Sequence, residues 1–283
     1  MGGLDLAVKS VFSNARVAWH VEVDDAACAL LDHHYPNVPN LGDVTRLDIT
    51  ALDGADVLTA GYPCQPFSTA GRREGLNDER HLWPVVFRAI CALRPRFTFI
   101  ENVRGHLNLG FDEVLRDCAS AGLDVRWAVV RASDVGAPHH RPRLFAVIAD
   151  PVEFRLEARE PSGKFASPVA GTSCSGRTFP RGGWGAPGHG AEHAKLTRQR
   201  FGRYTDAVLR WEQTMGAAPV PVLPGAGGRV MNVELPEWMM GLPRGFVTGV
   251  PGLSRKDILK ILGNGVVLLQ GAYALTNLFD YEV

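Results

Sequence analysis

Cysteine is scarce in this 283-residue chain, and its five cysteines do not fall at the spacings of a metal site or a disulfide framework. Few, scattered cysteines are typical of a reducing compartment, so we expect a cytoplasmic protein. The first residues do not resemble a signal peptide, and we expect no window apolar enough to span a membrane. These absences argue against secreted disulfide-rich proteins and membrane proteins.

Metal-binding and repeat patterns are also missing. His139 and His140 are adjacent, so their side chains point in different directions, and no cluster of cysteines or acidic residues accompanies them. We therefore predict no metal site. The glycine-rich residues 225–228 lack the Lys-Ser/Thr pair that follows in a phosphate loop, and we interpret them as a linker.

The chain has no net charge, because 30 Lys and Arg residues balance 30 Asp and Glu residues. The charges are nevertheless segregated: residues 151–230 hold 11 basic and 6 acidic residues, a net charge of +5, and the remainder carries −5. A local basic excess favours contact with a nucleic acid backbone, but an arginine-rich solvated loop gives the same count. Charge alone does not separate these two interpretations.

Buried-strand patterns alternate with helical patterns over the first 150 residues. We expect strands at 17–23, 56–60, 97–100, 125–130 and 144–148, and helices ending near 31 and spanning 82–93 and 111–121. This alternation predicts an α/β fold with a parallel, doubly wound sheet. Residues 161–193 and 219–228 are rich in Gly and Pro and predict irregular structure. Helical patterns return at 201–215, 234–240, 255–262 and 266–279.

One cysteine lies in a setting that packing does not explain. The predicted strand at 56–60 is followed by Gly-Tyr-Pro-Cys-Gln-Pro-Phe-Ser at 61–68. Pro63 and Pro66 disfavour a helix and hold Cys64 in an extended loop. Open α/β sheets bind ligands at the carboxyl ends of their strands. Cys64 is therefore a candidate nucleophile.

Two further polar blocks adjoin predicted strands. The strand at 97–100 leads into Glu101-Asn102-Val103, and Arg141-Pro142-Arg143 leads into the strand at 144–148. A thiol, a carboxyl group and two arginines would thus converge on one edge of the sheet. Taken singly, the carboxylate has the pattern of an ordinary strand end and the arginines that of a surface ion pair. Together they indicate a catalytic constellation.

This series of blocks resembles the DNA cytosine-5 methyltransferase family of bacteria and phages. The Pro-Cys-Gln, Glu-Asn-Val and Arg-x-Arg blocks stand in that family's order and spacing, and Gly-Asn-Gly-Val-Val at 263–267 resembles its closing motif. The resemblance covers nearly the whole chain. It implies a Rossmann-like sheet of the S-adenosylmethionine-dependent methyltransferases, with a small target-recognition domain inserted before the C-terminal helices. Amino-group methyltransferases are disfavoured because no Asp/Asn-Pro-Pro-Tyr/Phe block occurs.

The resemblance implies methyl transfer from S-adenosyl-L-methionine to C5 of cytosine in duplex DNA, with the target base flipped out of the helix. Cys64 would add to C6, which converts the ring into an enamine whose C5 can attack a methyl group. Glu101 would hold the N3 edge of the base and favour its protonation. Arg141 and Arg143 would brace the base carbonyl and the catalytic loop.

The same resemblance implies a cofactor pocket built from both ends of the chain. Glu22 would bind the ribose hydroxyls, as acidic residues do in dinucleotide folds, and Asp43 would face the adenine amino group. The other positions that match the pocket are Gly2, Gly3, Leu4, Val44, Pro63, Leu82, Asn264 and Val266.

The family's organisation divides the chain into a catalytic domain at 1–150, a target-recognition segment at 151–230, and a return to the catalytic domain at 231–283. We expect a monomer whose partners are duplex DNA and a cognate restriction endonuclease. The candidate substrate-binding residues are Gln65, Ser68, Asn102, Trp184, Arg198, Arg200 and Arg203.

The match departs from the family at the N-terminus. Family members open with a short apolar strand and a Phe-x-Gly-x-Gly-Gly turn, whereas Met1-Gly2-Gly3 matches only the tail of that turn. Our hypothesis is that Met1 is an internal methionine or a mis-assigned start, preceded by about ten residues in the natural product. Two alternatives stay open: a DNA-binding relic impaired in cofactor binding, and an RNA cytosine-5 methyltransferase.

Overall fold

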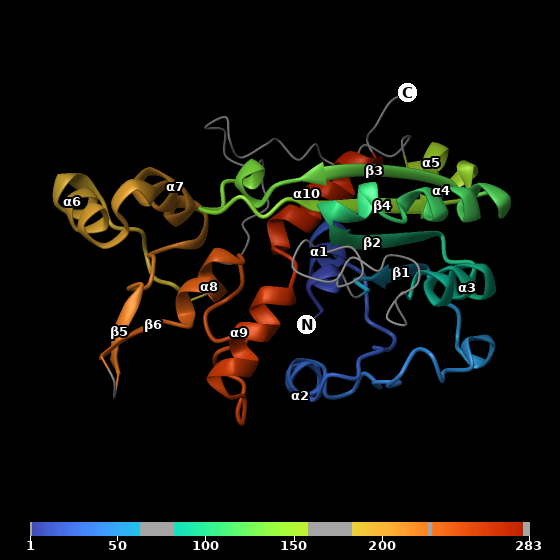
Figure 1. Cartoon of the computed structure of the whole chain (residues 1–283), viewed down its shortest axis with the longest axis horizontal. Helices are drawn as coiled ribbons and strands as arrows, with labels where there is room; N and C mark the ends of the chain where they lie inside the picture. The colour runs from blue at the N-terminus through green and yellow to red at the C-terminus, as the bar shows by residue number, and fades with distance from the viewer. Residues whose placement is uncertain (1, 63–81, 158–182, 226–227, 280–283) are drawn as a thin grey trace.

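The computed structural model describes residues 2–62, 82–157, 183–225 and 228–279. Among the described residues, a four-stranded sheet forms the centre of the right-hand part of the molecule in Figure 1. The strand order is β1-β2-β4-β3, with β1 and β2 parallel and β4 antiparallel to both of its neighbours. The bounds are β1 (Val57–Ala60), β2 (Phe97–Val103), β3 (Asp124–Val130) and β4 (Arg143–Ala149).

The expectation of an all-parallel sheet is wrong. Residues 131–142 join β3 to β4 and contain only a short 3₁₀ turn at Ala132–Val135, not the crossover α-helix that usually joins parallel strands. The prediction of a strand at 17–23 is also wrong. Of these seven residues, all described, only His20 forms a β-bridge, and this is an isolated bridge to Asn40. Its backbone N–H donates to the Pro39 carbonyl, and its carbonyl accepts from the N–H of Leu41.

Alternate residues of β4 face two separate hydrophobic layers, as the period of two in a strand requires. Phe145 and Val147 pack with α1 (Gly3–Val11) and α10 (Leu268–Phe279) on one face of the sheet. Leu144 and Ile148 pack with α3 (Trp83–Leu93) and α4 (Phe111–Ser120) on the other. The sheet is therefore buried on both sides, which explains why β4 is a continuous apolar run from Leu144 to Ala149.

The remaining elements lie around the sheet, most of them below it or to its left (Figure 1). They are α2 (Asp25–His34), α5 (Pro151–Glu157), α6 (Gly190–Phe201), α7 (Thr205–Met215), β5 (Val222–Gly225), β6 (Gly228–Met231), α8 (Glu234–Met239) and α9 (Arg255–Asn264). The antiparallel hairpin of β5 and β6 replaces part of the predicted linker at 219–228. The start of α6 falls in the stretch predicted to be irregular, because Thr197 is the one buried residue of that helix and no apolar stripe marks it.

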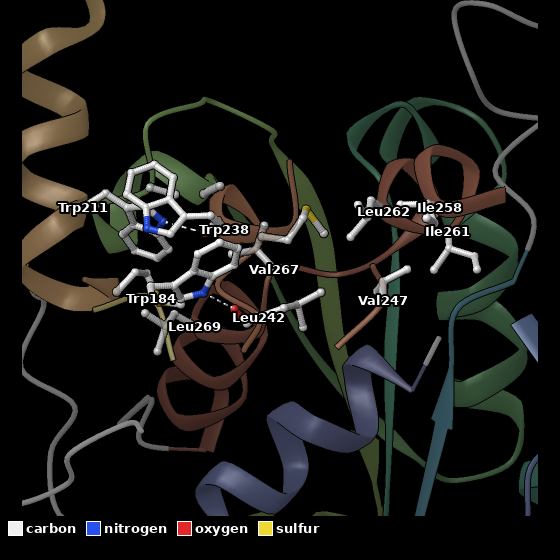
Figure 2. Close-up of a cluster of buried hydrophobic side chains, with 14 of the residues drawn as sticks. Trp184, Trp211, Trp238, Leu242, Val247, Ile258, Ile261, Leu262, Val267 and Leu269 are labelled. Atoms are coloured by element: carbon white, nitrogen blue, oxygen red, sulfur yellow. Dashed lines mark hydrogen bonds between the residues drawn. The ribbon is translucent and has the colours of Figure 1, made fainter. Parts of the chain in front are cut away.

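Three tryptophans join the predicted recognition segment to the C-terminal block (Figure 2). The indole N–H of Trp184 donates to the Leu242 carbonyl at 2.9 Å, and that of Trp211 donates to the Trp238 carbonyl at 2.9 Å. Trp238 in turn donates to the Gly216 carbonyl at 3.1 Å. One hydrophobic core thus crosses residue 230, and the division of the chain at that point stays a prediction.

One stretch, Arg255–Phe279, is long and apolar enough to cross a membrane by length and composition alone, so our expectation of no such window is wrong. The stretch comprises α9 and α10, and 67% of its apolar window is buried inside the protein. That burial is typical of core helices.

Candidate active site at the edge of the sheet

The carboxyl ends of β1 and β2 lie side by side, because the two strands are parallel and Ala60 pairs with Ile100. Gly61 and Glu101 therefore follow at neighbouring positions. A Cβ placed on Gly61 would lie 3.9 Å from Oε2 of Glu101 and 3.8 Å from the side chain of Leu4. Two strand ends and the beginning of α1 thus meet at one point.

Glu101 is a buried carboxyl group held by one arginine. Arg143, at the start of β4, places its Nε 2.9 Å from Oε1 of Glu101. Burial raises the pKa of Glu101 to about 7, although the charges of Arg143 and Arg141 act in the opposite direction. A carboxyl group that titrates near neutral pH can both give and accept a proton, which is a property of catalytic acids and bases.

Tyr62, the last described residue before 63–81, is anchored by His106. The hydroxyl of Tyr62 lies 2.7 Å from Nε2 of His106, and Nδ1 of His106 lies 3.0 Å from the Leu109 carbonyl. Because that carbonyl requires a proton on Nδ1, Nε2 accepts from the tyrosine. We did not single out Tyr62 or His106 from the sequence, where only their closeness to the Pro-Cys-Gln and Glu-Asn-Val blocks marks them.

The two arginines of the Arg-x-Arg block diverge. Arg143 binds Glu101, whereas Nη2 of Arg141 donates to the carbonyls of Gly263 and Gly265 at 2.7 and 2.6 Å. Arg141 therefore joins the block to the closing Gly-Asn-Gly motif. The pKa of the neighbouring His139 is lowered to about 4 by its burial and by both arginines, so this imidazole is neutral at neutral pH. In the described part of the chain, no group of three or more His, Cys, Asp or Glu could hold a metal ion.

The candidate cofactor residues at the chain start cluster with the closing motif. Gly2 precedes α1 in the left-handed conformation, and no side chain caps the helix. A Cβ on Gly3 would lie 3.2 Å from Cβ of Val266, so a larger residue there would press on the closing motif. Leu4 is buried beside Gly61. The open amides and dipole of the α1 N-terminus favour a negatively charged group such as an amino-acid carboxylate.

Asn40 brings the two acidic cofactor candidates together. Its Oδ1 accepts from the N–H of Glu22 at 3.0 Å and of Gly42 at 3.3 Å, and its Nδ2 donates to the Glu22 carbonyl at 3.0 Å. The two segments that carry Glu22 and Asp43 are thereby tied side by side. The sequence analysis missed Asn40, although the Asn-Leu-Gly-Asp turn signal at 40–43 could have indicated it.

The side chains of Glu22 and Asp43 are oriented by local hydrogen bonds. Oε1 of Glu22 accepts from the amides of Val23 and Asp24 at 2.9 and 3.0 Å, and these bonds engage only one of its two oxygens. Thr45 donates its amide and hydroxyl to Oδ1 of Asp43, which holds the pKa of Asp43 below its ordinary value. The other oxygen of Asp43, Oδ2, lies 3.6 Å from Nε of the exposed Arg46. Carboxylates oriented in this way fit the hydroxyl and amino groups of an adenosine.

The other candidates divide between described and undescribed residues. Val44 and Leu82 are half-buried, Asn264 is exposed at the end of α9, and Asn102 is buried with its Oδ1 accepting from the Val103 amide at 2.8 Å. Four candidates lie outside the described residues: Pro63, Cys64, Gln65 and Ser68.

The candidate DNA contacts separate into two kinds. Arg198 and Arg200 are exposed on α6, and Arg203 is exposed in the turn that follows, with its guanidinium 5.0 Å from the centre of the Tyr204 ring. Trp184 is 6% exposed, and its N–H is already bonded within the tryptophan core. The expectation that Trp184 contacts DNA is therefore wrong, because its large apolar surface is used in packing.

The family model for the C-5 cytosine-specific DNA methylases matches residues 1–168, which is more than half of the chain. The chain belongs to this family. The matched range of the methylase model contains the Pro-Cys-Gln, Glu-Asn-Val and Arg-x-Arg blocks and the Glu101–Arg143 pair.

Curated relatives match about half of the chain. The Type II methyltransferase M.NlaX of Neisseria lactamica is 32% identical over 163 residues, which cover 55% of this chain and 52% of the relative. M.NgoMIV of Neisseria gonorrhoeae is 34% identical over 132 residues, covering 45% and 42%. The chain thus spans about half or less of the length of these relatives.

Solved structures extend the likeness to the whole fold. The Dnmt2 methyltransferase of S. pombe has a TM-score of 0.63 at 14% identity, over 99% of this chain and 95% of that one. A structure titled as a DNA modification methyltransferase encoded within an E. coli prophage has a TM-score of 0.60 at 18% identity, over 99% and 97%. These likenesses confirm the predicted Rossmann-like methyltransferase fold.

Proposed function

We propose that this chain transfers a methyl group from S-adenosyl-L-methionine to C5 of cytosine in duplex DNA, through a covalent adduct between Cys64 and C6 of a flipped base. The observation that carries the proposal is the buried Glu101, held by Arg143 at the end of β2 with a pKa of about 7. Glu101 lies beside Gly61, and Gly61 precedes Cys64 by three residues in the sequence. A proton donor and a thiol at one sheet edge are what addition to a pyrimidine ring requires.

In this reaction the Sγ of Cys64 forms a bond to C6 while Glu101 gives its proton to N3, so the ring gains no net charge. The electron pair then available at C5 would form a bond to the methyl group of the bound sulfonium, with cleavage of the S–CH3 bond and departure of a neutral thioether. Removal of the C5 proton by a base and cleavage of the Sγ–C6 bond restore the aromatic ring and the thiolate, and N3 returns its proton to Glu101. Arg143 keeps the carboxyl group oriented toward the base throughout.

The residues at the start of the chain fit an S-adenosyl cofactor. The open N-terminus of α1 would receive the amino-acid carboxylate, Glu22 the ribose hydroxyls and Asp43 the adenine amino group. The bound cofactor supplies an activated methyl group on a sulfonium. Asn40 would keep the Glu22 and Asp43 segments in register with each other.

We further propose that duplex DNA is bound along the exposed arginines of α6 and the turn after it, Arg198, Arg200 and Arg203. The relatives are named as Type II methyltransferases, which supports the proposal that this protein acts beside a restriction endonuclease. The two alternative interpretations predict different results. A DNA-binding relic binds DNA but does not bind the cofactor, and an RNA cytosine-5 methyltransferase methylates tRNA in preference to DNA.

The test is transfer of labelled methyl from S-adenosylmethionine to unmethylated duplex DNA of many sequences, with tRNA offered in parallel. The wild-type chain should label DNA at C5 of cytosine, and Cys64→Ser should abolish labelling. Cys91→Ser is the matched control, because Cys91 is an exposed thiol on α3 that has no place in the mechanism.

Labelling that survives Cys64→Ser would overturn the covalent mechanism. Labelling of tRNA but not of DNA would overturn the DNA substrate and favour the RNA enzyme. DNA binding without cofactor binding, measured by calorimetry on the folded protein, would support the relic.

A further inference from the structure

Gln270 is a fully buried polar residue in the first turn of α10 that the mechanism does not use. Its Nε2 donates to two backbone carbonyls, that of Val130 at the end of β3 at 2.8 Å and that of Arg141 at 2.9 Å. Both acceptors lie well over a hundred residues away in the sequence. A buried amide costs stability unless it is hydrogen-bonded, so its presence on a largely apolar helix needs a reason.

The Arg141 backbone needs such support. Arg141 has a φ of +38°, in the left-handed region that non-glycine residues seldom adopt, and it precedes Pro142, which further restricts its conformation. A conformation of this kind persists only where the surroundings fix it. Gln270 bonds the carbonyl of the strained residue itself.

The strained conformation directs the Arg141 guanidinium at the closing motif. Nη2 donates to the carbonyls of Gly263 and Gly265, where α9 ends and backbone carbonyls lack helical partners. A cation at a helix C-terminus is also favoured by the helix dipole. The two bonds enclose Asn264, and the next residue, Val266, packs against Gly3 at the start of α1.

We propose that Gln270 is a positioning residue, which holds Arg141 in its left-handed conformation and thereby fixes the turn at 263–265 in the place that the cofactor requires. Three sequence blocks that are far apart, the Arg-x-Arg block, the closing motif and the chain start, are set relative to one another through this one amide. The effect on the cofactor rests on the proposed function; the effect on the turn does not.

The experiment compares the full-length wild type with Gln270→Met, which keeps the volume but removes the donor. The matched control is Thr276→Val, because Thr276 is also buried on α10 but, among the described residues, its hydroxyl bonds within the helix, to the Ala272 carbonyl at 3.0 Å. Amide hydrogen exchange is read for peptides covering 139–145 and 261–268. Gln270→Met should speed exchange in both peptides, whereas Thr276→Val should leave both unchanged.

A double-mutant cycle makes the path specific. If Gln270 acts through Arg141, then Gln270→Met should add nothing to the exchange of 261–268 in a protein that already carries Arg141→Ala. An additive effect would show that Gln270 stabilises the turn by packing alone and would overturn the proposal. Should Gln270→Met fail to fold, Gln270→Asn, which keeps the donor on a shorter side chain, gives the same readouts.

Cofactor affinity supplies the second readout. Well below the melting temperature, Gln270→Met should raise the KM for S-adenosylmethionine about tenfold, the equivalent of one or two lost hydrogen bonds, with kcat at saturation changed much less. A fall in kcat alone would contradict the positioning role. If the wild type binds no S-adenosylmethionine at all, the proposed function is overturned, and the exchange cycle still decides whether Gln270 positions the turn.

Discussion

Two buried glutamates of this protein, Glu237 and Glu101, differ in the groups that surround their carboxyl groups. Glu237, on α8, is 0% exposed and accepts four hydrogen bonds: from the amides of Gly245, Val247 and Thr248 at 2.9, 2.6 and 2.9 Å, and from the Thr248 hydroxyl at 2.8 Å. Glu101 is 8% exposed, and in the described part of the chain its ion pair is with Arg143. The first carboxylate is enclosed by donors on both oxygens, whereas the described residues pair the second with an arginine through one oxygen.

The contrast separates structural from chemical use of a buried acid. Four hydrogen bonds from one loop hold the Glu237 carboxyl group in place and close the 245–248 turn onto α8. Glu101 is desolvated, and the charges of Arg143 and Arg141 offset only part of that cost, so its pKa is raised to about 7 and its proton is available. Burial alone therefore does not mark a catalytic acid; the groups that surround the carboxyl group decide how it is used.

The largest expected effect is on catalysis, from Glu101→Gln. Glutamine keeps the shape and can still accept from Arg143, but it cannot give a proton to N3. We expect kcat for methyl transfer to fall about 10³-fold, within the range of general acid–base catalysis, while the melting temperature does not fall. Glu153→Gln, which breaks the ion pair of Glu153 with Arg96, is the control and should keep full activity. Equal losses of kcat in Glu101→Gln and Glu153→Gln would show that Glu101 has no special role in catalysis.

Glu237→Gln should have the opposite profile. The substituted amide group turns its own N–H groups toward a loop that offers only donors, so at least one backbone N–H becomes buried without an acceptor. We expect a loss of about 3 kcal/mol in the free energy of unfolding, measured in urea, with activity per folded molecule retained. Unchanged stability would show that the 245–248 turn does not depend on this carboxylate.

The pH dependence of stability tests the Glu101 side of the comparison. Its folded-state pKa of about 7 lies above the ordinary value of 4.5, so between these values the folded protein keeps a proton that the unfolded chain has released. Stability therefore falls as the pH rises through this window. From about pH 5 to about pH 8, the free energy of unfolding of the wild type should fall by about 2 kcal/mol more than that of Glu101→Gln. Chemical denaturation at a series of pH values measures this difference. Parallel curves for the two proteins would contradict the raised pKa.

The sequence was a good guide where an apolar run ended in a polar block. The strands β1, β2 and β4 lie within about two or three residues of their predicted positions. Because β1 and β2 run in parallel, their polar ends had to meet, which brings Glu101 to the residues that lead into Cys64. The site could be predicted because it follows from strand order and direction at one edge.

Other features carry no such signal. Gln270 and Asn40 are single polar residues whose partners lie in remote or folded loops, so no periodic pattern shows what they bind. The sequence around Trp184 does not show whether this side chain contacts DNA or packs in the protein core. Its hydrogen bond to the Leu242 carbonyl places it in the core. The polar helix α6 and the exposed hairpin of β5 and β6 lack the buried stripe on which sequence patterns depend.

The smallest effect comes from Thr248→Val, which removes one of the four donors to Glu237 and keeps the branched shape. Since the three amides still satisfy both oxygens, the unfolding free energy should fall by only about 1 kcal/mol, the value of a single buried hydrogen bond. The control is Thr50→Val, whose hydroxyl donates to the exposed Asp48 and should matter less because water replaces it. A loss as large as that from Glu237→Gln would mean that the hydroxyl, rather than the set of amides, holds the carboxylate. The enclosure of Glu237 would then depend on one bond, as the orientation of Glu101 depends on Arg143.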